Sequence, residues 1–216
     1  MALTKFNFNS FDVTTAASSA LAFNSSANGF DTAAAGATNL ISTTTVSSSV
    51  SNIDITSGIS STYDIYLFKI FNLHCSDNNT KPSVNFSTDG MSSTATKTTT
   101  HFYSFNNEAG SQNLFSYDTG GDLAQSTGDQ ALFFQNMTNV DDASGSGTVM
   151  LFSPSSTTFT KHFIADFHCM GNPVASARGF TAGYCNTTSA IDSIRFLMNS
   201  GTIDSCTIKM YGISKS

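Results

Sequence analysis

The sequence has few charged residues, no cluster of basic ones and no long apolar run. Charged residues make up 11% of the 216 residues, and the net charge is −6 with an isoelectric point of about 4.8. Without a basic patch to neutralise phosphates, the composition argues against nucleic-acid binding. No apolar run approaches the roughly 20 residues that cross a bilayer, which argues against membrane insertion. Because Met1–Phe8 lacks an apolar signal core, we expect synthesis in the cytoplasm without a secretory route.

Sequence motifs that mark common catalytic and metal centres are also missing. There is no nucleophile elbow, no H-E-x-x-H and no phosphate-binding glycine loop. The pairs His74-Cys75 and His168-Cys169 contain zinc-binding residue types. Adjacent residues on a strand point to opposite faces, however, so each pair offers only one ligand to a site. We therefore interpret both pairs as structural.

Acidic residues offer two weaker alternatives. Asp141 with Asp142, and Asp118 with Asp122, could hold a calcium ion between loops, although solvated acidic turns are the simpler interpretation. Paired carboxylates for glycoside hydrolysis need only be close in space, and no residue in the sequence marks such a pair. We therefore expect neither a cofactor nor an enzyme.

The four cysteines are Cys75, Cys169, Cys185 and Cys206, and they contain no C-x-x-C element. Their wide spacing, together with synthesis in a reducing compartment, favours buried free thiols. The alternative is one or two disulfides formed later.

What the sequence does contain is typical of an all-β protein. Nineteen Phe and six Tyr supply apolar surface to bury, and Thr lies well on a pleated surface. Turn signals recur every ~8–14 residues, which predicts a β-sandwich with a jelly-roll-like arrangement. The densest strand signal is 63–73. Because this strand is apolar on both faces, we expect it to be central, and we place Ile65 and Leu67 in the core.

The segment Ser189–Ile213 predicts a closing β-hairpin. Apolar residues alternate with polar ones on both sides of the Asn199–Gly201 turn, and period two places one face inside. The expected inward residues are Ile194, Phe196, Ile208 and Met210.

Residues 1–38 differ from the β-sandwich expected over 39–216. Scattered Phe side chains lie among small and polar residues, and no helical period persists. This pattern predicts an extended amino-terminal arm that docks on another subunit. The alternative is an arm folded against its own domain. The candidate anchors are Phe6, Phe8, Phe11 and Phe23.

Aromatic and amide side chains near expected loops suggest a glycan-binding alternative, because such groups stack on sugars and hydrogen-bond to them. The candidate contacts are Tyr103, Asn106, Asn107 and Tyr117.

Several stretches together resemble a family of structural proteins from tailed bacteriophages, especially marine ones. They are Ser60–Tyr66, Phe86–Gly90, Gly147–His162, Thr187–Phe196 and the ending Asn199–Ile213. The similarity spans about residues 39–213. Asn28–Asp31 is similar to the joint after an amino-terminal fibre segment in tail-fibre-like relatives. Cys206 departs from the pattern, where Gly is expected in the closing strand.

The resemblance implies a non-catalytic virion protein, exposed on the particle as a fibre, tail component or head decoration. The family provides no catalytic residues to transfer. We expect a homo-oligomer, most simply a homotrimer, that contacts other capsid or tail proteins. The alternatives are a module that recognises a host glycan receptor and a glycan-cleaving tail enzyme.

Overall fold

The computed structural model describes residues 21–23, 30–32, 38–133 and 135–213. The chain divides into two compact units at residues 37 and 38, next to the boundary expected after residue 38. In the first unit, β1 (Leu21–Phe23) pairs antiparallel with β2 (Phe30–Thr32). The expected anchors Phe6, Phe8 and Phe11 lie outside the described residues, and Phe23 ends β1.

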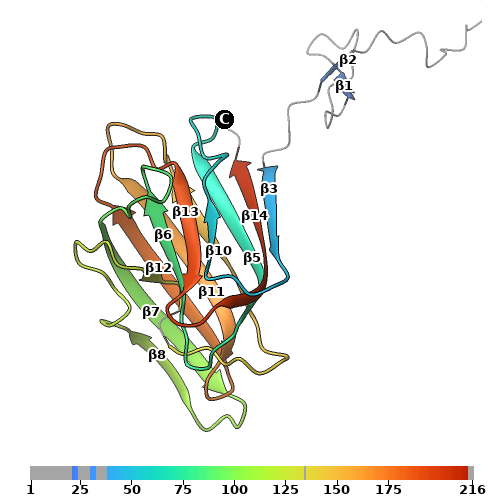
Figure 1. Ribbon diagram of the computed structural model, residues 1–216, viewed down its shortest axis with the longest axis vertical. Coiled ribbons are helices and arrows are strands. Elements are labelled where there is room, and N and C mark those ends of the chain that lie inside the picture. Colours follow the sequence, from blue (N-terminus) through green and yellow to red (C-terminus); the bar gives the residue numbers. More distant parts are fainter. Residues whose placement is uncertain (1–20, 24–29, 33–37, 134, 214–216) are drawn as a thin grey trace, which may run out of the picture. The chain divides into compact units, whose positions relative to one another are not determined.

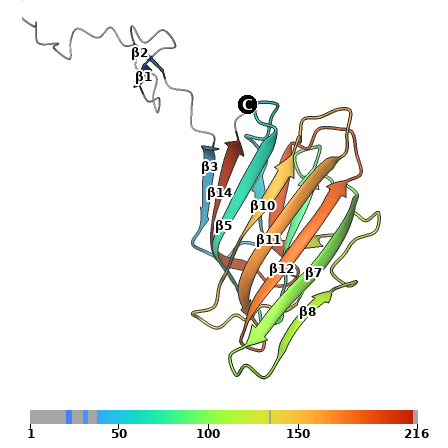
Figure 2. The same ribbon diagram turned by 180° about the vertical axis from the view of Figure 1, so that it is seen from behind.

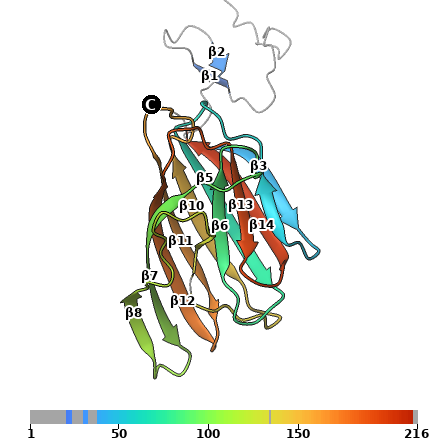
Figure 3. The same cartoon turned by 60° about the vertical axis from the view of Figure 1, so that its left-hand side comes forward.

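The second unit is a two-sheet β-sandwich, so the expected all-β sandwich is confirmed (Figures 1 and 3). The part of it that the structure describes contains an eight-stranded and a four-stranded sheet. The large sheet, seen face-on in Figure 2, runs in the order β3 (Thr38–Val46), β14 (Ile203–Ile213), β5 (Ile65–Cys75), β10 (Gly145–Phe152), β11 (Lys161–Gly171), β12 (Ala175–Cys185), β7 (Lys97–Asn107) and β8 (Asn113–Tyr117). The small sheet runs in the order β4 (Asn52–Ile55), β13 (Ser193–Met198), β6 (Pro82–Ser87) and β9 (Gln130–Ala131). The described residues contain no helix long and apolar enough to span a bilayer.

Strand pairing in the sandwich is nested. The early strands β3, β4, β5 and β6 pair antiparallel with the late strands β14, β13, β10 and β9, respectively. The chain therefore folds as a long antiparallel ribbon that is bent into two layers. Two additional strand pairs interrupt the ribbon, β7–β8 between β6 and β9, and β11–β12 between β10 and β13. Both pairs extend the large sheet beyond β10.

The predicted closing hairpin is wrong. Strands β13 and β14 do not pair with each other; β13 lies in the small sheet and β14 in the large one. The Asn199–Gly201 turn instead connects the two layers, with Gly201 at φ 70°. Alternation had placed Ile194, Phe196, Ile208 and Met210 inside, and all four are buried. Period two identifies the inward face of a strand, and that face is the same whether the two strands pair edge to edge or face each other across the core.

Strand β5 is central, between β14 and β10, as predicted. The choice of its inner face was wrong, however. Tyr66, Phe68 and Ile70 are buried, while Ile65 and Leu67 lie half-buried on the outer face. Because both faces of β5 are apolar, the alternation of its residues does not indicate which face is buried. Only packing against the opposing sheet decides that. Phe68, for example, packs against Phe196 of β13, with ring centroids 5.9 Å apart.

Candidate functional site

An aromatic surface lies on the outer face of the large sheet, on the flank built by β11, β12, β7 and β8. Cross-strand partners share a face, and Phe102 of β7 is paired with both Tyr117 of β8 and Phe180 of β12. The Phe102 ring stacks on Phe180 at 4.9 Å and meets Phe115 edge-on at 5.5 Å. Phe115 is 69% exposed and Tyr117 is 51% exposed. We name the four residues Phe102, Phe115, Tyr117 and Phe180 the aromatic face.

An ion pair continues this surface toward β11. The guanidinium of Arg178 lies over the Phe180 ring, 4.5 Å from its centroid. Its Nε donates to Asp166 Oδ1 at 2.8 Å, and its Nη2 donates to Asp166 Oδ2. The hydrogen bond to Asp166 raises the pKa of Arg178 above its usual value. The two hydrogen bonds to one carboxylate hold the guanidinium beside the Phe180 ring, so the ion pair extends the aromatic face toward β11.

The proposed glycan contacts fall in different places. Tyr103 is buried on the inner face of β7, so the prediction that it is an exposed glycan contact is wrong. Adjacent residues of a strand point to opposite faces, and Tyr103 directly follows Phe102, whose side chain lies on the outer face. Asn107 directs its side-chain oxygen into its own turn, accepting from the backbone N–H groups of Ser111 and Gln112, both at 3.0 Å.

Two of the proposed contacts remain accessible. Asn106 is exposed near the end of β7. Tyr117 belongs to the aromatic face, and its hydroxyl donates to Asp122 Oδ2 at 2.6 Å. That hydrogen bond raises the pKa of Tyr117. Sequence reasoning missed Phe102, Phe115, Phe180 and Arg178. The sequence signal that could have found them is their alternation within three strands, which places them on one face of the sheet. That signal becomes informative only once the pairing of the three strands is known.

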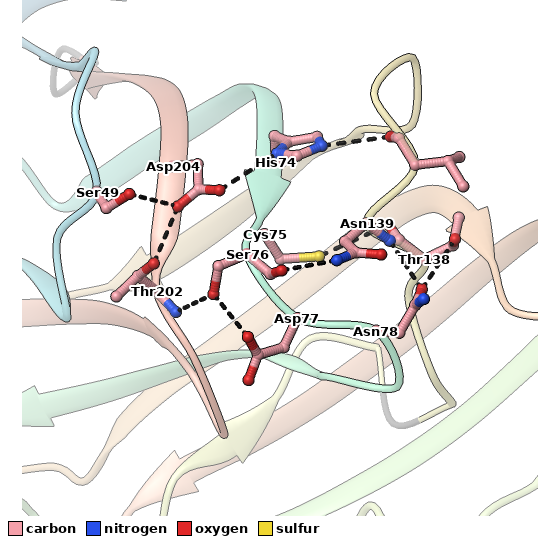
Figure 4. A network of polar contacts seen from close by, with 11 residues as sticks. Ser49, His74, Cys75, Ser76, Asp77, Asn78, Thr138, Asn139, Thr202 and Asp204 are labelled. Carbon is pink, nitrogen blue, oxygen red and sulfur yellow. Dashed lines mark hydrogen bonds and ion pairs between the residues drawn. The ribbon is translucent and has the colours of Figure 1, made fainter.

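A second polar cluster surrounds His74 at the end of β5 (Figure 4). Asp204 accepts hydrogen bonds from Ser49 at 2.7 Å and Thr202 at 2.9 Å, and its other oxygen lies 3.8 Å from His74 Nδ1. The hydrogen bond from Ser49 is the main reason why the pKa of Asp204 is lowered. His74 Nε2 donates to the Val140 carbonyl at 3.3 Å. Because Ser49 contacts the carboxylate and not the imidazole, these residues do not form a nucleophile–base–acid relay.

The same region ties loops together. Ser76 Oγ accepts from the Thr202 backbone at 2.9 Å, and Asn139 Nδ2 donates to the Ser76 carbonyl at 2.7 Å. Asn78 Oδ1 accepts from Thr138 Oγ1 at 3.1 Å (Figure 4). These contacts connect the end of β5, the start of β14 and the 138–140 segment. We interpret the cluster as a structural junction.

The metal alternatives find no support within residues 38–133 and 135–213, where no group of three or more His, Cys, Asp or Glu is placed to hold an ion. Asp118 accepts from Gln135 Nε2 at 2.8 Å and from the Gly120 backbone at 3.0 Å. All four cysteines lie in the described part, and each is a buried free thiol, as predicted.

Comparison with known proteins finds no match to a family model, a curated protein or a solved structure. The likeness to phage structural proteins therefore rests on the sequence stretches described above.

Proposed function

We propose that this chain is a non-catalytic structural protein exposed on the surface of a tailed-phage particle. The observation that carries the proposal is the nested pairing of β3 to β6 with β9, β10, β13 and β14. We infer from this pairing a jelly roll, an architecture used by viral capsid and lectin domains. A fold alone does not assign a function, so the phage assignment also depends on the sequence resemblance.

Immunogold labelling tests the virion assignment. Antibodies raised against residues 38–216 are applied to purified particles from a lysate that produces this protein. We expect label on the particle, at the head, tail or fibre. Protein found only in the soluble fraction of the lysate would contradict the proposal.

We further propose that the chain assembles as a homotrimer through the β8 edge. Strand β8 ends the large sheet, and Leu114, Phe115 and Tyr117 are all exposed on it. An apolar edge strand is an aggregation hazard unless another surface covers it. The trimer number is an analogy with fibres and spikes, which are commonly cyclic.

Sedimentation equilibrium at micromolar concentration tests the assembly. We expect a trimer for the wild type and dissociation for Phe115→Ser. Phe159→Ser is the matched control, because Phe159 is similarly exposed at 72% but lies in the loop before β11. A monomeric wild type, or equal dissociation of both variants, would contradict assembly through β8.

Residues 1–38 are proposed as the attachment segment. Their support is the division of the chain at residues 37 and 38 and the five Phe side chains in that segment, among them the four candidate anchors. Burying one Phe contributes roughly 1.5–3 kcal/mol, so several together could hold a subunit on the particle. Deleting residues 1–37, which leaves β3 intact, should produce a folded sandwich that fails to incorporate. Normal incorporation of the truncated protein would sink this idea.

The aromatic face favours glycan binding as a second candidate function. The stacked rings of Phe102 and Phe180, next to the Arg178–Asp166 pair, combine apolar surface with polar groups at its border. Sugars present apolar faces and hydroxyl groups to such surfaces. On a glycan array, wild-type binding that disappears in Phe180→Ser would support this role. An array without signal for the wild type would exclude it.

A further inference from the structure

Two lysine side chains are completely buried in the sandwich. Lys97 begins β7 and Lys161 begins β11, and both are 0% exposed. In the strand register each is paired with Cys185 of β12, so the three residues form a row across the sheet. Burial lowers the pKa of both lysines. Since burying an ammonium without a paired carboxylate is costly, such groups need an explanation.

The two lysines differ in what their amines contact. Lys161 Nζ donates to two backbone carbonyls, those of Phe159 at 2.8 Å and Thr187 at 3.2 Å. Lys97 Nζ donates to the Ala95 carbonyl at 2.9 Å and to the side-chain oxygen of Asn85. Only Lys97 therefore has a carboxamide as its hydrogen-bond partner.

The Asn85 carboxamide is held at both ends. Its oxygen faces the Lys97 amine, and its nitrogen donates to Asp129 Oδ1. Asn85 is 2% exposed, so water has little access to the group. Asp129 stands next to Asn85 because the β6–β9 register, which pairs Val84 with Gln130, continues by one residue. The result is an amine, a carboxamide and a carboxylate in a single line of contacts.

Burial makes the neutral, nucleophilic form of the Lys97 amine more accessible than it is for an exposed lysine. Burial lowers its pKa to about 8, against smaller opposing effects of Cys185 and Asp129. None of the ion pairs among the described residues includes Lys97. A neutral amine keeps two N–H bonds for its two acceptors and gains a free lone pair. Desolvation of this kind is one way in which proteins activate lysine as a nucleophile.

We propose that Lys97 and Asn85 form an intramolecular isopeptide bond, with Asp129 as the proton carrier. Lys97 Nζ attacks Asn85 Cγ, and a C–N bond forms. The proton released by Nζ passes through the Asp129 carboxylate to Asn85 Nδ2. The Cγ–Nδ2 bond then breaks, and ammonia leaves. Atoms and charges balance without an oxidant, a reductant or a metal, and Asp129 is regenerated.

Proximity makes this slow reaction feasible. Groups held in reactive contact reach effective concentrations of about 10⁵–10⁸ M. Exclusion of water also protects the carboxamide and the new amide from hydrolysis. The bond would join β6 of the small sheet to β7 of the large sheet (Figures 1 and 3). It would therefore tie the two layers covalently, which goes beyond the proposed structural role.

Intact-mass spectrometry of the full chain under denaturing conditions tests the proposal. We expect the wild type to be lighter than its sequence mass by one ammonia. Peptide mapping should recover a branched peptide that joins Asn85 to Lys97. Lys97→Met should have its full calculated mass, whereas the matched control Lys161→Met, which removes the other buried amine, should still lose ammonia.

Three outcomes would overturn the inference or part of it. A wild type that keeps its full mass after prolonged incubation at pH 8 to 9 excludes the bond. Ammonia loss that persists in Lys97→Met shows that a succinimide elsewhere, such as at Asn28-Gly29, is responsible. Retained cross-linking in Asp129→Asn, a substitution that preserves size at an exposed position, overturns the role given to Asp129.

Discussion

Strands β5 and β7 belong to the same sheet, yet their inner faces carry opposite kinds of side chain. The buried face of β5 is apolar and includes Tyr66, Phe68 and Ile70. The buried face of β7 begins with Lys97, Thr99 and His101. We call the part of the large sheet that buries these three residues and Thr181 of β12 its polar half, and the part around β5 its apolar half.

The layer that covers each half explains the difference. Strand β5 faces the small sheet, whose backbone groups are already paired within the sheet. Strands β7 and β12 face the segment 121–133, which is irregular except for the two-residue strand β9, so most of its backbone groups need other partners. Thr99 Oγ1 accepts from the Leu123 backbone at 2.8 Å, and Thr181 Oγ1 donates to the Ala131 carbonyl at 3.1 Å. Buried polar side chains of the large sheet thus hydrogen-bond to backbone groups of a covering segment that is mostly not strand.

The covering layer also lies closer to the sheet at one point of the polar half. A Cβ added to Gly179 of β12 would lie 2.4 Å from the Leu132 carbonyl oxygen. Glycine therefore lets the covering backbone approach the large sheet directly. Over the apolar half, large side chains of the small sheet such as Phe196 fill the space between the layers. We expect each half to respond to a different kind of substitution.

Phe196→Ala, in the small sheet opposite the apolar half, should give the largest loss of stability. Phe196 is fully buried against Phe68, so the free energy of unfolding should fall by about 3–5 kcal/mol through lost transfer energy and a cavity. Urea denaturation followed by fluorescence measures the change. A near-neutral result would show that the apolar half is not packed as described.

Thr181→Val tests the polar half with a substitution that hardly changes volume. Thr181 Oγ1 also hydrogen-bonds to His101 Nδ1 at 2.8 Å, so losing the hydroxyl should cost about 1–3 kcal/mol. Ile208→Val is the counterpart in the apolar half, and its expected cost is about 0.5–1.5 kcal/mol. The same denaturation assay compares the two variants. If Thr181→Val costs less stability than Ile208→Val, hydrogen bonds from buried polar side chains are not what holds the segment 121–133 on the sheet.

Acid should weaken the polar half through His101. Burial lowers the pKa of His101 below its ordinary value of 6.5. The unfolded chain therefore takes up a proton first as pH falls below 6.5, and stability is lost in that window. The urea midpoint should decrease between pH 7.5 and 5.5 in the wild type, and this decrease should shrink in His101→Gln. His162→Gln, at an exposed position on β11, should keep the wild-type pH dependence; an unchanged slope in His101→Gln would refute the assignment.

The four thiols should have the smallest effect. All are buried and free, and burial raises the pKa of Cys75 to about 11 and those of Cys185 and Cys206 to about 12. We expect reductant to leave the melting temperature unchanged. Iodoacetamide at pH 8 should modify the thiols only after unfolding, because reaction needs an accessible thiolate. A fall of several degrees with reductant would reveal a disulfide.

Much of the fold follows from local pattern. Turn spacing and β-branched composition predict the all-β sandwich, and the double apolar face of 63–73 predicts that β5 is central. Alternation predicts that Ile194, Phe196, Ile208 and Met210 point inward. These inferences succeed because the alternation of side chains between the two faces is a property of a single strand and does not depend on its partners. The candidate site was less accessible, since Tyr117 was the only residue of the aromatic face proposed from the sequence.

Only tertiary structure decides which strands meet. Period two defines two faces of a strand but neither its partner nor, when both faces are apolar, its inner side. The sequence alone therefore determined that residues 193–213 form two half-buried strands, while the long-range pairing separated β13 and β14 into opposite sheets. For the same reason the contact of Lys97, Asn85 and Asp129 could not be foreseen. It arises where strands of two different sheets and the segment before β9 come together, and local physical preferences carry no information on how the sheets stack.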